Sequence, residues 1–381
     1  MAKHQKHAKL SKPGYGEFHR NELAILGTNC AAIRNLVNGI IQELNQQYNI
    51  AYVDTEHNGS AINEDSVLTN GGSVEFIDKI TYRSISYKHS FNPFQNRVLF
   101  NEQDFVLVNG NHFIAQSQVI VIDPAKPLEK KLEKLTNVQL ILLTDDVSSL
   151  PDYLIKHLPV GFAAPILKLS DTLAITTFVS NWLKQKLSPL NGLVLAGGKS
   201  ERMQTDKGGI NYFGQSQRIH MHELLSAHCA QTFISYANAA TINAEENLPA
   251  ITDTFIGLGS LGGILSAFQN NPNTAWLTVA CDLPYLSAQT LAYLVEQRNP
   301  SKMATCFMDS DSQFPEPLIT IWEPRAYPAM LQFLSQGYSC PRKVLINSEV
   351  ELLQVPDVAD LQNINYPEER DRVMQHLQRT S

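Results

Sequence analysis

The chain has 381 residues, of which 43% are hydrophobic and 18% charged, and its formal net charge is −7. This length allows two domains or one large one, and the negative charge gives no reason to expect nucleic-acid binding. No apolar run is long enough to cross a bilayer, and no apolar segment follows the basic opening MAKHQKHAKLSK, as a signal peptide would require. The five cysteines are scattered without a CxxC pair, so we expect reduced thiols in a cytoplasmic protein.

In the first half of the chain, short apolar runs alternate with helical patterns. Strand-like runs follow a basic extension (residues 1–20) at Leu23–Leu26, Ile50–Asp54, Phe105–Asn109, Val119–Asp123 and Leu140–Asp146, with helical stretches at Ile33–Leu44 and Leu173–Lys184. Such an alternation is typical of mainly parallel sheets covered on both faces. We therefore predict a three-layer α/β domain over residues 21–186, and the polar segment KQKLSPLN (184–191) is the expected linker.

The second half repeats this alternation. Its strand-like runs lie at Gly192–Ala196, Phe233–Asn238, Trp276–Asp282, Met303–Phe307 and Pro317–Trp322. A second three-layer α/β domain with a mainly parallel sheet is therefore predicted over residues 190–381.

Two glycines directly follow the first of these strands, in LVLAGGKSERMQTDKGGI (193–210). Glycine has no Cβ, so the backbone at Gly197 and Gly198 can approach a ligand closely and offer N–H groups to phosphate oxygens. Arg202 and Lys207 add positive charge beside the same loop. A plain strand-to-helix turn is the alternative, but the cations that follow favour a phosphate site. The glycine spacing matches neither a dinucleotide fingerprint nor a P-loop.

Two aspartates follow later strands of the second half. Asp282 ends the run WLTVACD just before a Leu-Pro pair, and ligands of open α/β sheets bind at such strand ends. A carboxylate there can hold Mg²⁺ against phosphates; a helix N-cap is the alternative. Asp253 follows a short apolar run and precedes the glycine-rich start of a helix (257–268), which suits a nucleotide base or a phosphate, although a plain loop is the alternative.

These residues together resemble molybdenum cofactor guanylyltransferase, within the glycine-loop nucleotidyltransferase superfamily. The resemblance covers about residue 192 to the C-terminus and rests on LAGGKSERMQTDKG, TDTF followed by LGSLGG, CDLPYLS and NINYPEE (363–369). It implies a Rossmann-like nucleotidyltransferase fold that uses Mg²⁺. It also implies that the terminal phosphate of molybdopterin attacks the α-phosphate of GTP, giving the guanine dinucleotide form of the cofactor and pyrophosphate. Further implied partners are other proteins of molybdenum cofactor biosynthesis or acceptor molybdoenzymes.

The resemblance also implies a role for each matching residue. The implied nucleotide-binding residues are Leu195, Ala196, Gly197, Gly198, Arg202, Lys207, Asn238, Asp253 and Asp282. Lys207 and Asp282 are the implied catalytic residues, with Asp282 as metal ligand. The family asparagine at the end of the second strand falls on Tyr236 or Asn238, and we prefer Asn238.

The remaining implied residues concern the second substrate. Asn363 and Asn365 are expected near the reacting phosphates. Arg342 is a candidate for the pterin phosphate, with an ordinary surface cation as the alternative.

The first half resembles the GTP-binding adapter protein of the same pathway, through NELAILGTNCAAIRNLVNGIIQEL. It departs from that family at the P-loop, where Ala32, Ile33 and Arg34 stand in place of Gly, Lys and Ser/Thr. Asn109 likewise stands where the adapter family has an acidic residue. We therefore interpret residues 21–186 as a degenerate P-loop domain that does not hydrolyse nucleotide.

Two alternatives to a guanylyltransferase remain open at this point. One keeps the chemistry and changes the substrates, to a cytidylyl version or to a sugar-phosphate or polyol-phosphate nucleotidyltransferase. The other is a catalytically silent scaffold that delivers the cofactor. The presence of Lys207 and Asp282 argues against a silent domain.

Overall fold

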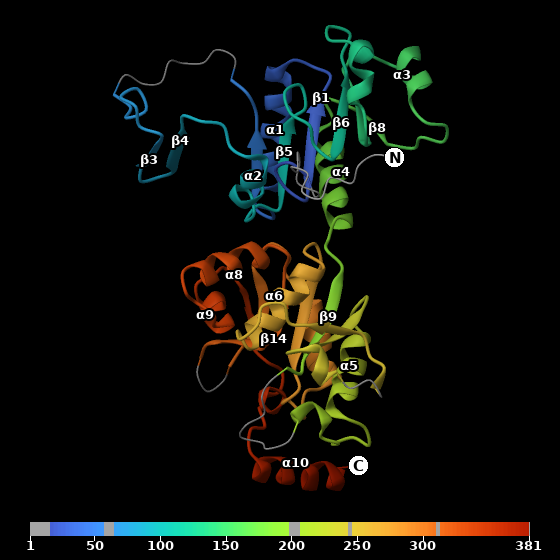
Figure 1. Cartoon of the computed structure of the whole chain (residues 1–381). Coiled ribbons are helices and arrows are strands. Elements are labelled where there is room, and N and C mark those ends of the chain that lie inside the picture. Colours follow the sequence, from blue (N-terminus) through green and yellow to red (C-terminus); the bar gives the residue numbers. More distant parts are fainter. Residues whose placement is uncertain (1–15, 57–64, 198–205, 243–245, 310–312, 381) are drawn as a thin grey trace, which may run out of the picture. The chain divides into compact units, whose positions relative to one another are not determined.

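The computed structural model describes residues 16–56, 65–197, 206–242, 246–309 and 313–380 (Figure 1). The chain divides into two compact units, residues 1–186 and 187–381. Each unit has its own sheet and its own apolar core. Within the described part of the chain, no helix combines the length and the apolar character needed to cross a membrane.

The first unit is built on a six-stranded sheet in which every neighbouring pair of strands is parallel (Figure 1). In spatial order the strands are β2 (Ile50–Val53), β5 (Phe105–Asn109), β1 (Glu22–Leu26), β6 (Ser117–Ile122), β7 (Val138–Leu143) and β8 (Ile166–Lys168). Helices α1 (Cys30–Leu44) and α4 (Thr172–Gln185) pack on one face, and α3 (Asp152–His157) packs on the other. The apolar side chains of the strands therefore divide between two cores, because successive residues of a strand point to opposite faces.

An antiparallel hairpin also belongs to the first unit, formed by β3 (Val74–Asp78) and β4 (Arg83–Tyr87). It makes a separate two-stranded sheet and is followed by the short helix α2 (Pro93–Leu99). The sequence analysis does not predict this hairpin. Several of its apolar side chains are exposed, among them Phe76 and Ile85.

The second unit is built on a seven-stranded mixed sheet. In spatial order its strands are β11 (Ala250–Thr252), β10 (Thr232–Tyr236), β9 (Leu190–Leu195), β12 (Ala275–Ala280), β14 (Pro315–Trp322), β13 (Ala304–Met308) and β15 (Glu351–Leu353). Only β14 runs antiparallel to its described neighbours, β12 and β13. The predicted α/β class with mainly parallel sheets is thus confirmed.

Helices cover both faces of this second sheet. They span α5 (Gln217–Ser226), α6 (Ser260–Asn270), α7 (Ala288–Glu296), α8 (Ala326–Ser335) and α9 (Pro341–Ile346). Helix α10 (Pro367–Thr380) instead packs through Val373 in a small separate cluster with Ile364. One core lies on the side of α5 and α7, and the other on the side of α6 and α8. Helix α6 approaches the sheet closely, since a Cβ on Gly263 would lie 2.5 Å from the Ser235 hydroxyl. This close approach explains the glycine at position 263.

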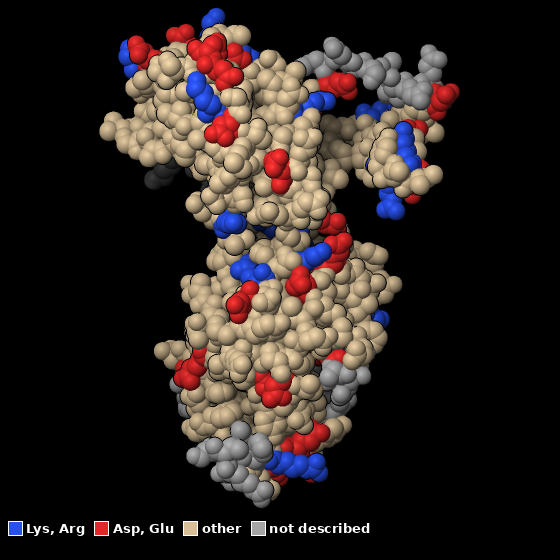
Figure 2. Space-filling model, turned by 180° about the vertical axis from the view of Figure 1, so that it is seen from behind, with Lys and Arg blue, Asp and Glu red and all other residues tan. Residues whose placement is uncertain are grey.

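Charges are mixed on the surface. On the face drawn in Figure 2, Lys and Arg are interspersed with Asp and Glu, in keeping with the net charge of −7. An anionic substrate must therefore be held by local cations rather than by a broad basic surface.

Candidate active site

The carboxyl ends of three parallel strands define the candidate site. Strands β10, β9 and β12 are neighbours and run in the same direction, so their ends lie at one edge of the sheet. Leu195 ends β9, and the N–H of Ala196 donates to the carbonyl of Ser235 at 3.1 Å. Gly197 then passes so close to β10 that a Cβ there would lie 2.9 Å from the amide nitrogen of Ala237. The first glycine of the loop is thus required by backbone packing.

Lys207 lies between two side chains that come from distant parts of the chain. Its ammonium donates to Asp282 Oδ2 at 3.1 Å and to Asn365 Oδ1 at 2.8 Å. The fold also ties the last two segments together, because the N–H of Ile364 donates to the carbonyl of Asp282 at 2.8 Å. The side chains of Lys207 and Asp282 are 20% and 19% exposed. A cation, a carboxylate and an amide are therefore held together where solvent and ligand can reach them.

One oxygen of Asp282 is left for a ligand. Oδ2 receives the Lys207 ammonium, whereas Oδ1 is buried and has no hydrogen-bond partner among the described residues. A buried carboxylate oxygen without a partner is costly unless something else satisfies it. The described residues contain no cluster of three or more His, Cys, Asp or Glu that would hold a metal by themselves. This donor set suits an ion such as Mg²⁺, which takes one or two carboxylates and completes its shell with phosphate oxygens and water.

Asp253 lies at the same edge, just after β11. Its N–H donates to the carbonyl of Tyr236 at 2.9 Å, and its Oδ1 accepts from the Ser235 hydroxyl at 3.3 Å. Burial raises the pKa of the Asp253 carboxyl above its ordinary value, against the lowering effect of the Ser235 hydrogen bond. This half-buried carboxylate accepts a hydrogen bond from Ser235 and has further acceptor capacity for the N–H groups of a ligand.

Tyr236 and Asn238, the two candidates for the position where the family has an asparagine, lie in different environments. Tyr236 is buried at the end of β10, and its ring lies 6.0 Å from the guanidinium carbon of Arg218. Asn238 is exposed, and its side-chain oxygen accepts from the N–H of Ala240 at 3.0 Å, which caps a short 3-10 helix. A capping asparagine can still offer its amide N–H groups to a ligand.

The residues expected near the second substrate are spread more widely. Asn363 is exposed, whereas Asn365 contacts Lys207. Arg342, at the start of α9, donates to Glu316 Oε2 at 2.8 Å and lies 3.7 Å from Asp309 Oδ2. Its charge is thus already matched by two carboxylates. Burial raises the pKa of the Glu316 carboxyl, while Arg342 and a backbone hydrogen bond from Leu318 act to lower it.

Gly198 and Arg202, which were expected to bind the nucleotide, lie outside the described residues.

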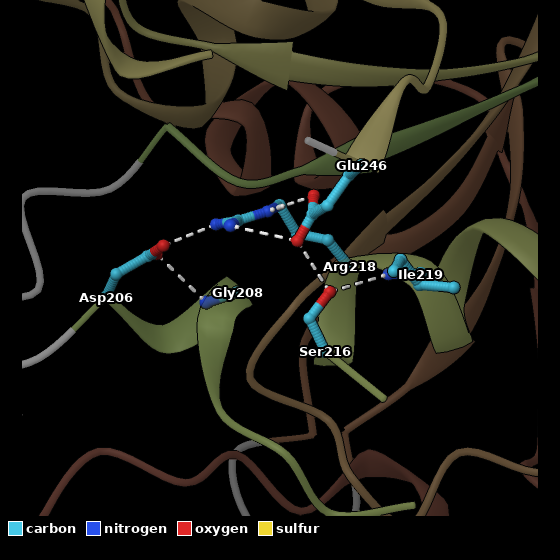
Figure 3. A network of polar contacts seen from close by, with 6 residues as sticks. All are labelled: Asp206, Gly208, Ser216, Arg218, Ile219 and Glu246. Atoms are coloured by element: carbon cyan, nitrogen blue, oxygen red, sulfur yellow. Dashed lines mark hydrogen bonds and ion pairs between the residues drawn. The ribbon is translucent and has the colours of Figure 1, made fainter. Parts of the chain in front are cut away.

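A buried charge network beside the site was missed by the sequence analysis (Figure 3). Arg218, at the start of α5, has a side chain that is 6% exposed and contacts carboxylates on both sides, Asp206 and Glu246. Its Nε donates to Glu246 Oε2 at 3.0 Å, and the Ser216 hydroxyl donates to Glu246 Oε1 at 2.7 Å. The partners lie far from Arg218 in sequence, so no local motif signals the network.

The corresponding edge of the first unit is organised differently. Only Gly27, Thr28 and Asn29 separate β1 from α1, so the connection is shorter than a P-loop. The side chain of Asn29 caps α1 by accepting from the N–H of Ala32 at 2.9 Å. Ile33, which stands in place of the P-loop lysine, is fully buried in the core under α1.

Carboxylates at this first edge are satisfied within the protein. Asp54 accepts from Arg34 at 3.0 Å, from the Tyr52 hydroxyl at 2.9 Å and from Asn109 Nδ2 at 2.7 Å. Asn109, which stands where the adapter family has an acidic residue, thus donates a hydrogen bond to Asp54.

The chain is similar to known proteins over part of its length. Residues 192–351 match the family model described as the MobA-like NTP transferase domain. The chain is 36% identical over 187 residues to the molybdenum cofactor biosynthesis bifunctional protein of Synechocystis, a match that covers 49% of this chain and 54% of that protein. It is 29% identical over 195 residues to the molybdenum cofactor guanylyltransferase of Shewanella frigidimarina, covering 48% of this chain and 95% of that protein. The chain thus spans about half the length of the bifunctional relative.

Two solved structures are also similar to parts of the chain. Molybdopterin-guanine dinucleotide biosynthesis protein A from Archaeoglobus fulgidus is 21% identical with a TM-score of 0.43, covering 50% of this chain and 99% of that one. MobB from Bacillus subtilis is 15% identical with a TM-score of 0.32, covering 42% of this chain and 96% of that one.

Proposed function

From the match of residues 192–351 to the MobA-like NTP transferase family, we propose that the second unit transfers GMP from GTP to molybdopterin and releases pyrophosphate. The observation that carries this proposal is the Lys207 ammonium held between Asp282 and Asn365, beside a buried Asp282 Oδ1 that has no hydrogen-bond partner among the described residues. Acceptor molybdoenzymes or other proteins of molybdenum cofactor biosynthesis are the proposed partners.

The reaction needs little covalent chemistry from the protein. An oxygen of the terminal phosphate of molybdopterin bonds to the α-phosphorus of GTP, and the bond from that phosphorus to the β-phosphate oxygen breaks. Negative charge grows on the departing pyrophosphate, so positioning and charge neutralisation supply most of the catalysis. The Lys207 ammonium lies beside Asp282 at the ends of the strands. We assign to it the neutralisation of charge on the departing pyrophosphate.

The two oxygens of Asp282 suit two different cations. Lys207 holds Oδ2, which leaves the buried Oδ1 for Mg²⁺. When bound, Mg²⁺ would neutralise part of the negative charge of the phosphates. Asn365 keeps Lys207 in place without adding charge. The ammonium and the metal therefore need not compete for the same carboxylate oxygen.

Asp253 is the proposed base-recognition residue. Guanine presents a ring N–H and an amino group side by side, and a carboxylate can accept from both. The Asp253 carboxylate is half-buried, and the Ser235 hydroxyl holds one of its oxygens. Burial strengthens a hydrogen bond to such a group once it is formed.

We propose that the first unit has no working P-loop and does not hydrolyse nucleotide. Its strand-to-helix connection is three residues long, and the side chain of Ile33 points into the core. The chemistry of the chain is therefore assigned to the second unit.

A nucleotide screen tests the choice of base. The melting temperature of the full chain is measured with Mg²⁺ and a saturating concentration of GTP, CTP, ATP or UTP. A ligand that binds the native state raises the melting temperature by mass action. We expect GTP to give the largest shift and Asp253→Asn to reduce it. If CTP stabilised the chain and GTP did not, a cytidylyl transfer would replace the proposed reaction.

A further inference from the structure

We propose that Arg218 is a positioning residue that aims Lys207 at the reacting phosphates by clamping the segment on both sides of it. This inference rests on the proposed function, since it gives Lys207 a role in the transfer. Figure 3 shows the arrangement: the Arg218 guanidinium lies between Asp206, which precedes Lys207, and Glu246.

The guanidinium connects three segments of the second unit. Asp206 follows the glycine-rich loop, Arg218 lies in the first turn of α5, and Glu246 precedes β11. Arg218 Nη1 contacts Asp206 Oδ2, while Nε and Nη2 donate to the two oxygens of Glu246 at 3.0 and 3.2 Å. The planar guanidinium is suited to a bidentate pair with one carboxylate while it contacts a second.

Both neighbours of Lys207 are fixed by this clamp. The N–H of Gly208 donates to Asp206 Oδ1 at 3.1 Å, and the N–H of Gly209 donates to the Asp206 carbonyl at 3.1 Å. A Cβ on Gly208 would lie 2.6 Å from Arg218 Cγ, so the backbone of Gly208 rests directly against the arginine side chain. Arg218 holds Asp206 and Gly208, the residues on either side of Lys207. The Lys207 side chain therefore leaves the segment in a fixed direction, toward Asp282.

The clamp stays charged. Burial by itself would lower the pKa of Arg218, but its hydrogen bonds to Glu246 and Asp206 outweigh this effect and raise the pKa. Loss of the guanidinium would leave the carboxylates of Asp206 and Glu246 without the cation that now lies between them. Lysine in its place would keep the charge but would present a single ammonium that cannot pair with both carboxylates in this geometry.

A matched pair at the opposite edge of the same sheet provides the control. Arg298 donates from Nε to Glu323 Oε1 at 2.6 Å and from Nη2 to the carbonyl of Ser188, just before β9 begins. Its side chain is 14% exposed and that of Glu323 is 2% exposed. Arg298→Lys therefore damages a comparable buried ion pair at the amino end of β9, away from Lys207.

The experiment compares Arg218→Lys, Glu246→Gln and Arg298→Lys in the full chain. Amide hydrogen exchange of residues 206–210 is measured by mass spectrometry, together with the melting temperature and the rate of pyrophosphate release from GTP and molybdopterin. We expect faster exchange in residues 206–210 for Arg218→Lys, a smaller increase for Glu246→Gln and no local increase for Arg298→Lys. A displaced catalytic group typically costs up to a hundredfold in rate. We therefore expect a fall in kcat of about tenfold to a hundredfold for Arg218→Lys.

A double variant separates positioning from general damage. If Arg218 acts through Lys207, adding Arg218→Lys to Lys207→Ala lowers kcat no further than Lys207→Ala alone. The inference would be overturned if the losses in kcat of Arg218→Lys and Lys207→Ala were additive in the double variant. It would also be overturned if amide exchange at residues 206–210 were the same in Arg218→Lys as in Arg298→Lys. If the wild-type chain releases no pyrophosphate, the proposed function fails, and the exchange measurement alone then decides whether Arg218 fixes the segment around Lys207.

Discussion

The two units differ in how the carboxylates at the carboxyl ends of their parallel strands are hydrogen-bonded. In the first unit, the carboxylate of Asp54 is shared by a guanidinium, a hydroxyl and an amide. In the second unit, Asp282 has one oxygen on Lys207 and one buried oxygen without a partner among the described residues. Both edges bring polar groups to strand ends, but only the second leaves a buried carboxylate oxygen to be satisfied from outside.

This difference shows that strand-end geometry alone does not make a ligand site. The same parallel architecture positions side chains at both edges. At the first edge the carboxylate of Asp54 is satisfied by internal hydrogen bonds, which lowers its capacity to bind an ion. The second edge keeps a cation, a carboxylate and an amide in contact while leaving capacity for a ligand.

The largest expected effect comes from Asp282→Asn, which removes the carboxylate that distinguishes the second edge. Asparagine keeps the shape and a carbonyl oxygen, but it binds Mg²⁺ far less tightly. We expect transfer activity to fall on the order of 10³-fold, with partial recovery at high Mg²⁺ concentration. Pyrophosphate release across a Mg²⁺ titration measures this, with circular dichroism as the check of folding. A folded variant with a near wild-type rate would show that the metal is held elsewhere.

Lys207→Ala is expected to lower the rate by a somewhat smaller factor, on the order of 10²-fold to 10³-fold, because one preorganised electrostatic contact is lost. It removes the cation from the leaving pyrophosphate but leaves both oxygens of Asp282 free for Mg²⁺. Added Mg²⁺ should therefore not restore its rate. The same titration distinguishes the two variants, and recovery of Lys207→Ala by Mg²⁺ would mean that the lysine only neutralises Asp282.

Ile33→Lys tests the first edge by restoring the P-loop residue type. Ile33 is fully buried under α1, so a lysine there would carry an unpaired charge into the core. We expect a loss of about 3 kcal/mol in the free energy of unfolding and no gain of GTP hydrolysis. Urea unfolding and orthophosphate release measure the two quantities, with Arg34→Lys on the exposed side of α1 as the control. GTP hydrolysis by Ile33→Lys or Arg34→Lys above a buffer blank would contradict the interpretation of the first unit as a degenerate P-loop domain.

The smallest expected effect is a pH dependence from Asp253. Burial raises the pKa of its carboxyl above the ordinary 3.8, so protonation occurs at a higher pH in the folded chain than in the unfolded chain. As pH falls through the raised pKa, the unliganded fold gains stability, because the buried charge is removed. GTP binding weakens over the same range, because a protonated carboxyl no longer accepts two N–H groups. The thermal shift from GTP should thus shrink in the wild type as pH falls through the raised pKa of Asp253, and Asp253→Asn should lack this dependence. A pH-independent shift in the wild type would remove Asp253 from base recognition.

Much of the second unit follows from its sequence, since apolar runs and the residues that end them are local features. The runs ending at Leu195 and Ala280 form neighbouring strands, which brings Lys207 and Asp282 to one edge. Periodicity does not encode strand direction, so the antiparallel course of β14 could not be predicted.

Long-range pairings are the part that sequence reasoning could not supply. Arg218 looks like an ordinary residue of an amphipathic helix until Asp206 and Glu246 are seen beside it. Arg342 likewise has its charge matched by Glu316, which lies 26 positions away. The hairpin of β3 and β4 was missed because its strands are largely exposed and lack the apolar continuity of the central strands.

The most direct test of the account is pyrophosphate release by the full chain with Mg²⁺, GTP and molybdopterin, with the product identified by mass spectrometry. The account predicts release only when both substrates are present, a product that joins GMP to molybdopterin, and little release when CTP, ATP or UTP replaces GTP. Release that does not depend on molybdopterin, or equal release by the wild type, Asp282→Asn and Lys207→Ala, would contradict it.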